Sequence, residues 1–582
     1  MKKSVSAFLL ILAMMAAMLP TAAAVGQDKL PDEDAFGYVY QFVTADTIEI
    51  TEYNGYESEV VVPSEIDGYT VVGIASFTAD GETNERLTKV TLPDTVTYIA
   101  DSAFEYSVGS YGPSTSLREV VLGKGLQRIG RRAFAYNLDL QKINIPAGVT
   151  EIGEEAFVSC QSLSEITFEG EASFCGSAFG TQMGFYSMPA VIRTAYNDWL
   201  YDDAAGDFFV WKDCLFGYRG TDKMPKIPDG VRVIAAYSFY QSEITGVEIP
   251  DSVRVIGDHA FQSCPLISVD IPGSVEKIEN GAFSDCEKLE TVTFHPGLKV
   301  IDEFAFEDCA ALEKVELPDG LLELNSGTFG SCYALEDIYF PASLEKTDRS
   351  AIQDTKYFEN LASGQEIYCG GVFLGYAGMY IDPPQDIRVK AGTKNVLLTD
   401  YLDNVRSITL PEGLLYATFT GYYDCKITSL SFPESVKYIN CSAFPELVSL
   451  KLPTSATLER GAFDNCPKLK SVKLPKGNAY LSAFSTCDQL ETLTLPDDVV
   501  TLGPIGGKSL KQIDLGKTLR VIGESAFSGA SALTDITIPD SVVTLESDAF
   551  KGCTSLSSVR GGKNVTLIED SCFNGCTSLT DF

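Results

Sequence analysis

The sequence predicts a mainly-β repeat solenoid, in which one short coil recurs along nearly the whole chain. Three observations predict it: a phrase of fixed pattern returns about every 22–23 residues, a phenylalanine anchors each copy, and in many copies a cysteine follows that phenylalanine three residues later. Such self-similarity is the signature of repeat architectures. A chain of 582 residues would otherwise suggest about three to five globular domains. The length of the chain therefore reflects the number of coils in one array rather than the number of domains.

The repeating phrase is an apolar residue, two others, Val or Ile, one other, Leu or Ile, Pro, then V-x-x-I and A-F-x-x-C-x-x-L. Alternation in its first part predicts a short strand with every second side chain inward. Pro followed by Gly, Ser or Asp ends that strand. Because one coil cannot bury its apolar edge alone, neighbouring coils must stack at about 4.7–4.9 Å. Roughly twenty coils would give a rod or arc on the order of 100 Å long. The clearest copies are Leu266–Leu289, Leu289–Leu312 and Leu312–Leu335.

The interior of the solenoid is predicted to be a ladder of aromatic rings and thiols. No cysteine pair has C-x-x-C spacing, which argues against a zinc or thioredoxin-type site. Stacking would place neighbouring Cα atoms within the disulfide range of about 4.4–6.8 Å, but ladder side chains lie parallel, and a buried Cys behaves as a small hydrophobe. We therefore expect reduced, buried thiols. The clearest ladder residues are Phe261, Phe283, Phe306 and Phe329, with Cys264, Cys286, Cys309 and Cys332.

The phrase V-x-x-I-x-x-x-A-F-x-x-C resembles the BspA-type leucine-rich repeat proteins of bacteria and some parasitic protists. Its period falls within the leucine-rich repeat range of about 20–29 residues. The chain has neither an L-x-x-N ladder nor an amphipathic helix on the return side, which favours the BspA type over the horseshoe type. The resemblance covers nearly the whole mature chain. It implies a surface or secreted binding protein, since some members look like adhesins for host proteins.

The ends of the chain predict an exported array. Lys2 and Lys3, the apolar run Ala7–Leu19 and three small residues at Ala22–Ala24 read as a cleaved secretory signal peptide. The last residues match the opening of another strand, which indicates either a fragment or an exposed edge that pairs with something. The predicted organisation is signal peptide 1–24, N-terminal β cap 25–75, repeats 76–183, hairpin insert 184–226, repeats 227–353, hairpin insert 354–401 and repeats 402–582 ending mid-repeat.

The two inserts share an apolar-Gly-Tyr ending, at Phe216–Tyr218 and Leu374–Tyr376. This ending predicts a hairpin that restarts the solenoid after each interruption. Both tryptophans, Trp199 and Trp211, lie in the first insert. That insert is either a ligand loop or a structural splice that packs aromatic side chains against the last coil.

Composition argues against catalysis and against a nucleic-acid partner. The chain has 44 Lys+Arg against 80 Asp+Glu, a net charge of −36, whereas phosphate neutralisation needs basic residues. Its 2 histidines leave little room for a His-based metal site or triad; His259 is expected to be exposed, and neither it nor His295 has a fixed catalytic partner. The acidic cluster Asp202–Asp207 lacks the EF-hand order. We expect no enzyme activity, metal or cofactor.

What remains is the surface of the strands. Outward positions form parallel columns, which solenoids commonly use for binding; the clearest column is Asp270, Thr293, Glu316 and Tyr339. The predicted function is that of a secreted or cell-surface, non-enzymatic binding protein acting in adhesion or host-protein recognition. Its partner would be an extracellular or host protein or glycan. The chain itself is expected to have no membrane span after signal cleavage and to be a monomer. The alternative is a structural spacer that displays a missing C-terminal anchor or domain.

Overall fold

The computed structural model is a mainly-β solenoid of about 20 turns with almost no helix, which confirms the predicted fold class. The predicted signal peptide, Trp199 and residues 203–205 of the Asp202–Asp207 cluster lie outside the described residues. Among the residues described, no helix is long and apolar enough to cross a membrane. The structure describes residues 38–55, 57–77, 87–105, 117–170, 206–377, 384–398, 402–422, 424–478, 480–505 and 507–580, with isolated positions between 173 and 202.

Most coils contribute one strand to an outer sheet and one to an inner sheet. In the outer sheet, β18 (Ser268–Ile271) pairs in parallel with β20 (Thr291–Phe294). In the inner sheet, β19 (Lys277–Ile278) pairs in parallel with β21 (Val300–Ile301). These parallel pairs join equivalent positions one repeat apart, so the same repeat position stacks on itself from coil to coil.

The A-F-x-x-C corner makes a third side of the coil. The backbone N–H of Phe261 donates to the carbonyl of Ala282 in the next coil at 2.7 Å, and that of Phe283 donates to Ala305 at 2.8 Å. Asp285 and the equivalent Asp308 have φ of 58° and 55°, the left-handed region that Asp, Asn and Gly adopt most readily. This backbone requirement explains why short polar residues recur just before the cysteine.

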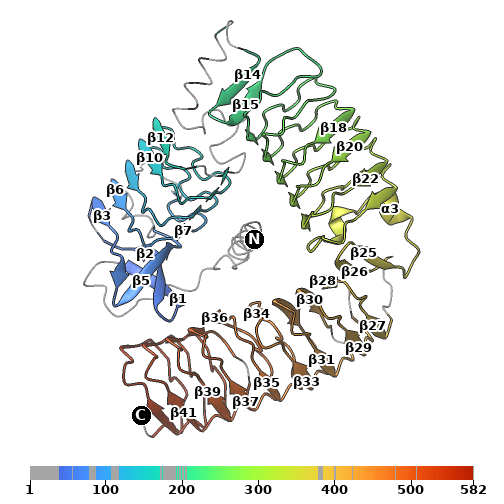
Figure 1. Ribbon diagram of the computed structural model, residues 1–582. Helices are drawn as coiled ribbons and strands as arrows, with labels where there is room; N and C mark the ends of the chain where they lie inside the picture. The colour runs from blue at the N-terminus through green and yellow to red at the C-terminus, as the bar shows by residue number, and fades with distance from the viewer. Residues whose placement is uncertain are drawn as a thin grey trace, which may run out of the picture.

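Three blocks follow one another along the chain, beginning with the N-terminal block, residues 38–170 (Figure 1). Its strands alternate between the two sheets. The inner sheet runs β1-β2-β5-β7-β9-β11-β13 with β4 on β5, and the outer sheet runs β12-β10-β8-β6-β3. The bounds are β1 (Tyr38–Thr44), β2 (Thr47–Tyr53), β3 (Glu59–Val61), β4 (Glu65–Ile66), β5 (Tyr69–Ile74), β6 (Lys89–Thr91), β7 (Tyr98–Ile99), β8 (Glu119–Val121), β9 (Arg128–Ile129), β10 (Lys142–Ile145), β11 (Glu151–Ile152), β12 (Glu165–Phe168) and β13 (Ser173–Phe174).

The central block comprises residues 206–377. Its inner sheet runs β14-β15-β16-β17-β19-β21-β23, and its outer strands pair as β18-β20 and β22-β24. The remaining bounds are β14 (Phe208–Trp211), β15 (Cys214–Tyr218), β16 (Val233–Ile234), β17 (Val255–Ile256), β22 (Lys314–Glu316), β23 (Glu323–Leu324), β24 (Asp337–Tyr339), the 3-10 turn η3 (Arg349–Ala351), α3 (Lys356–Glu359), β25 (Glu366–Cys369) and β26 (Val372–Tyr376).

The C-terminal block comprises residues 384–580. Its first inner sheet continues from the β25–β26 hairpin of the central block and runs β25-β26-β28-β30-β32-β34, and its second runs β36-β38-β40-β42-β44. Its outer strands pair as β27-β29, β31-β33, β35-β37-β39 and β41-β43. The bounds are β27 (Asp386–Arg388), β28 (Asn395–Leu398), β29 (Ser407–Thr409), β30 (Tyr416–Thr420), β31 (Ser429–Ser431), β32 (Tyr438–Ser442), β33 (Ser449–Lys451), β34 (Thr457–Leu458), β35 (Ser471–Lys473), β36 (Tyr480–Leu481), β37 (Thr492–Thr494), β38 (Thr501–Leu502), β39 (Gln512–Asp514), β40 (Val521–Ile522), β41 (Asp535–Ile538), β42 (Thr544–Leu545), β43 (Ser558–Gly561) and β44 (Leu567–Ile568).

A two-stranded hairpin separates each block from the next. β14 and β15 are antiparallel, and β15 then pairs in parallel with β16, which restarts the inner sheet. Phe216 belongs to the hydrophobic core of the N-terminal block, whereas Leu215 belongs to that of the central block. At the second hairpin, Phe373 and Leu374 divide in the same way between the C-terminal and central cores. Each described hairpin therefore lies between two hydrophobic cores and packs against both. This packing agrees with the structural interpretation of the inserts.

The β1–β2 hairpin closes the N-terminal end of the array. The rings of Tyr38 and Tyr53 lie 6.4 and 5.3 Å from the ring of Phe77, which anchors the first coil. Strand β3 already pairs with β6 of the next coil. The outer sheet thus begins inside the stretch predicted as a cap.

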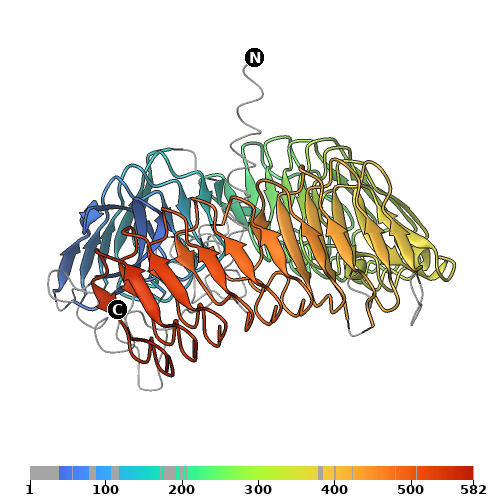
Figure 2. The same cartoon turned by 90° about the horizontal axis from the view of Figure 1, so that it is seen from below.

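The three blocks bend into a ring whose two ends lie side by side (Figures 1 and 2). Arg520, in the C-terminal block, donates from Nη2 to the carbonyl of Ala45 in the β1–β2 turn at 3.1 Å. Its guanidinium also lies 5.4 Å from the centre of the Tyr69 ring. The inner strands line the concave side of the ring, and the outer strands form its convex side.

Candidate binding surface

The phenylalanine ladder fills the interior of the coils that the structure describes. The rings of Phe261, Phe283 and Phe306 are fully buried and stack at 5.1 Å with planes 5° apart. Phe329 continues the stack at 5.7 Å. Offset stacking of this kind adds about 0.5–1.5 kcal/mol per pair beyond the burial of area.

The cysteine ladder lies beside the phenylalanines, and its thiols are expected to be unreactive. The Cys264 thiol donates to the carbonyl of Phe239 at 3.0 Å, and Cys286, Cys309 and Cys332 make the same bond one coil further each time, at 3.3, 3.4 and 3.1 Å. Burial raises the pKa of the Cys264 thiol to about 12 and raises the pKa values of Cys286 and Cys309 further. Because only the thiolate is a nucleophile, these side chains act as packing groups.

The predicted binding residues lie in one exposed column on the convex side of the central block. Asp270 and Thr293 are register partners in β18 and β20, and Glu316 and Tyr339 are register partners in β22 and β24. All four are exposed. Tyr339, with 54% of its surface accessible, is the large side chain of the column.

The convex face of the central block is predominantly acidic. Beside the column lie the exposed carboxylates of Glu313 and Asp337. Lys314 bridges two coils, with Nζ 2.8 Å from Glu316 and 3.5 Å from Asp337. His295 lies 2.9 Å from Asp270. The outward positions therefore form a wide polar surface with carboxylates in excess and one aromatic anchor.

The other histidine differs from its sequence prediction. His259 is half-buried rather than exposed, because its ring stacks on Tyr237 of the preceding coil at 5.0 Å, with planes 5° apart. It fills a packing position at the corner of the coil. No group of three or more metal-ligating side chains occurs in the described part of the chain.

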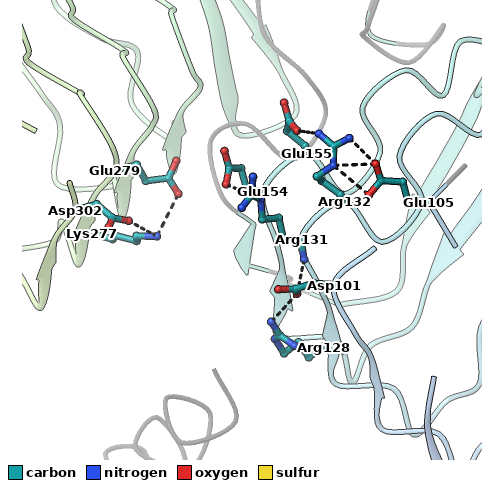
Figure 3. A network of polar contacts seen from close by, with 10 residues as sticks. All are labelled: Asp101, Glu105, Arg128, Arg131, Arg132, Glu154, Glu155, Lys277, Glu279 and Asp302. Carbon is teal, nitrogen blue, oxygen red and sulfur yellow. Dashed lines mark hydrogen bonds and ion pairs between the residues drawn. The ribbon is translucent and has the colours of Figure 1, made fainter. Parts of the chain in front are cut away.

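A second polar cluster lies on the N-terminal block where it faces the central block (Figure 3). Arg132 lies 2.5 Å from Glu105 of the preceding coil and 2.7 Å from Glu155 of the following coil. Arg131 lies 3.3 Å from Glu154. These arginines pair with carboxylates of their own block, so the cluster ties coils together and presents no open binding site.

Polar groups at the rim of a shallow hollow, at the turns of two coils, are also paired with one another. Its rim includes Lys226, Gly230, Glu248 and Ser252. Lys226 pairs with Glu248 at 2.7 Å, and the Ser252 hydroxyl accepts a hydrogen bond from the Gly230 N–H. The hollow has no paired nucleophile and base.

One charged surface was missed from the sequence. Lys451, Lys470, Lys473 and Lys476 are exposed on two adjacent coils of the C-terminal block. The total charge of −36 concealed them, because it averages over all coils. Charge counted at each repeat position would have found them.

The repeat itself decides the family. The BspA type leucine rich repeat region matches in six copies, over residues 82–188, 226–361, 416–505 and 505–582. The chain belongs to the BspA-type leucine-rich repeat family. This result confirms the predicted resemblance, and proteins of this family are repeat scaffolds rather than a recognised enzyme fold.

Similar solved structures include bacterial leucine-rich repeat proteins. A leucine-rich cell surface protein from Faecalibacterium prausnitzii is 19% identical over 96% of this chain and 95% of its own, with a TM-score of 0.21. A leucine-rich repeat protein from Bacteroides ovatus is 18% identical over 95% and 94%, with a TM-score of 0.19. The pneumococcal vaccine antigen PcpA is 16% identical over 71% and 94%, with a TM-score of 0.25. Scores this low mean that the whole molecules do not superpose. Among curated proteins, none matches the chain.

Proposed function

We propose that this protein is an exported, non-enzymatic binding protein of the cell surface or the surrounding medium, which recognises an extracellular or host protein along its convex face. One observation carries the proposal: polar outward positions of the paired outer strands lie in register and exposed, while the phenylalanine and cysteine ladders are buried. Solenoids bind partners along such extended faces. Membership of a repeat family whose solved relatives include a cell surface protein agrees with it.

The column around Tyr339 is the proposed contact. Tyrosine is enriched at binding hot spots, whereas isolated rim charges add little affinity. We therefore assign Tyr339 the role of anchor, with Asp270 and Glu316 selecting a partner surface of complementary positive charge.

A binding screen tests the proposal. The chain without residues 1–24 is immobilised and exposed to a panel of extracellular-matrix proteins and mucin glycans. For a panel member that binds, the triple variant Asp270→Ala, Glu316→Ala, Tyr339→Ala is expected to weaken binding by about tenfold or more. A control triple variant, Asp497→Ala, Glu524→Ala, Tyr333→Ala, changes charge and aromatic content equally at exposed positions elsewhere. It should bind like the parent protein.

Two results would overturn the proposal. Equal loss in both triple variants would show that the column is not the contact. Failure of every panel member to bind would favour a spacer, whose role is to display another part of the protein.

A further inference from the structure

The lysine patch, defined as Lys451, Lys470, Lys473 and Lys476, lies on the convex face of the C-terminal block. Lys451 ends β33, Lys473 ends β35, and Lys470 and Lys476 flank β35 before the strand and after its proline. Neighbouring coils stack about 4.7–4.9 Å apart. Four ammonium groups therefore gather on two adjacent coils, all of them exposed.

The carboxylates around the patch are already engaged by other groups. Glu446 pairs with Lys468 at 2.5 Å, and Glu491 pairs with Lys511 at 3.0 Å. Glu434 accepts from the N–H and the hydroxyl of Thr454 at 2.8 and 3.0 Å. Asp498 accepts from the N–H of Gly477. None of the carboxylates described pairs with a patch lysine, so the patch keeps its full positive charge in a strongly acidic protein.

The positive charge of the patch lowers the pKa values of two carboxylates at its edge. The pKa of Glu434 lies below its usual value because of the hydrogen bonds from Thr454, and the fields of Lys451 and Lys473 lower it further. The pKa of Glu491 is lowered first by Lys511 and additionally by Lys470. The patch therefore already stabilises negative charge beside it.

Hydroxyl groups accompany the lysines. The outward positions of four successive outer strands are Ser429, Ser449, Ser471 and Thr492, and all are exposed. Ser431 and Lys451 are register partners, as are Lys473 and Thr494. Lysine beside hydroxyl donors is the combination that proteins use against sulfate-like and phosphate-like oxygens.

The composition of the patch decides between classes of partner. Residues 448–454 and 470–477 contain no aromatic residue. Protein interfaces are enriched in aromatic residues and depleted in Lys and Ser, and single-stranded nucleic acids are held by aromatic stacking. Clustered basic residues occur in patches that bind heparin or nucleic acid, and without aromatic stacking a heparin-like polyanion fits this patch better than a single-stranded nucleic acid. We infer that the lysine patch is a binding site for a linear anionic polysaccharide carrying sulfate or carboxylate groups.

Affinity measurements with two polysaccharides test this site. Binding of the chain without residues 1–24 to heparin and to hyaluronan is measured at low and at physiological salt, with binding to one or both expected. The variant Lys451→Gln, Lys470→Gln, Lys473→Gln, Lys476→Gln is expected to lose about tenfold or more in affinity at low salt, as four exposed ion pairs together predict. Binding to heparin alone would assign sulfate as the recognised group, and binding to hyaluronan alone would assign carboxylate.

A matched control separates local charge from total charge. Lys390, Lys508, Lys551 and Lys563 lie in the same block but pair with carboxylates at 2.7–2.8 Å. Their fourfold replacement by Gln changes the net charge equally and should leave affinity within about threefold. Equal loss in both variants, absence of binding to both polysaccharides, or equally tight binding of an oligothymidylate would each overturn the inference. These outcomes are distinguishable from those of the earlier screen, because its triple variant changes side chains of the central block and leaves the lysine patch intact.

Discussion

The central and C-terminal blocks use one repeat to build two surfaces of opposite charge. In the copy that starts at Leu312, the outward positions are Glu313, Glu316 and Asp319. In the copy that starts at Leu469, the same positions hold Lys470, Lys473 and Lys476. The difference teaches that packing fixes the inward positions and leaves the outward positions free to carry recognition.

The largest expected effect concerns what the two blocks share. Phe283→Ala in the central block and Phe550→Ala in the C-terminal block each remove a fully buried ring from the stack. Each should lower the free energy of unfolding by about 3–5 kcal/mol, measured by urea unfolding. A large loss in one block and none in the other would break the claim of a common scaffold.

Thiol labelling compares how accessible the cysteines of the two blocks are to a reagent. Cys264 is fully buried and its pKa is raised by burial to about 12, whereas Cys576 is partly exposed. Since alkylation needs an accessible thiolate, iodoacetamide at pH 8 should label Cys576 first and leave Cys264 unlabelled until denaturant is added. Peptide mass spectrometry reads the order. Rapid labelling of Cys264 in the native chain would contradict the closed ladder.

A smaller effect on stability distinguishes a charged side chain that forms ion pairs from one that forms none with the described carboxylates. Burial alone would raise the pKa of Glu105, but hydrogen bonds from Arg132 and Ser102 and the charge of Arg132 lower it overall. A lowered folded pKa stabilises the fold above the unfolded value of about 4.3, and this stability is lost as the pH falls through the folded value. Arg132→Leu should therefore cost about 0.5–1 kcal/mol at pH 7 after solvent screening, and less in acid.

Lys473→Gln is the control for that measurement. Lys473 is exposed and pairs with none of the carboxylates that the structure describes, so the substitution should change stability by less than about 0.5 kcal/mol. Equal costs for Arg132→Leu and Lys473→Gln, or an Arg132→Leu cost that is independent of pH, would refute the distinction.

The last effect concerns the contact between the ends of the ring, and we expect it in the shape of the molecule. Arg520→Ala removes the bond to the Ala45 carbonyl and the contact with the Tyr69 ring, which together are worth about 1–2 kcal/mol. Small-angle X-ray scattering should show a larger maximum dimension for the variant, with the thermal midpoint nearly unchanged. An unchanged scattering profile would mean that the curvature of the coils alone holds the ring.

The sequence was enough to predict the coil but not the ring. Phe283 and Cys286 recur at fixed spacing because stacking demands it, so periodicity revealed the ladders and the outward columns. Closure depends instead on small rotations accumulated over many coils, and it ends in a contact between residues 475 positions apart. The half-buried position of His259 was missed because it depends on Tyr237 one coil away. Lys473 was missed because a total charge hides a local one.

Grafting the lysine pattern tests the central claim most directly. Thr293→Lys, Glu313→Lys, Glu316→Lys and Asp319→Lys place lysines in the central block at the positions of Lys451, Lys470, Lys473 and Lys476. If outward columns carry recognition independently of the core, these four substitutions, introduced into the variant Lys451→Gln, Lys470→Gln, Lys473→Gln, Lys476→Gln, should raise its heparin affinity at low salt by about tenfold or more, with an unchanged thermal midpoint. A folded variant without any gain in heparin affinity would contradict the account.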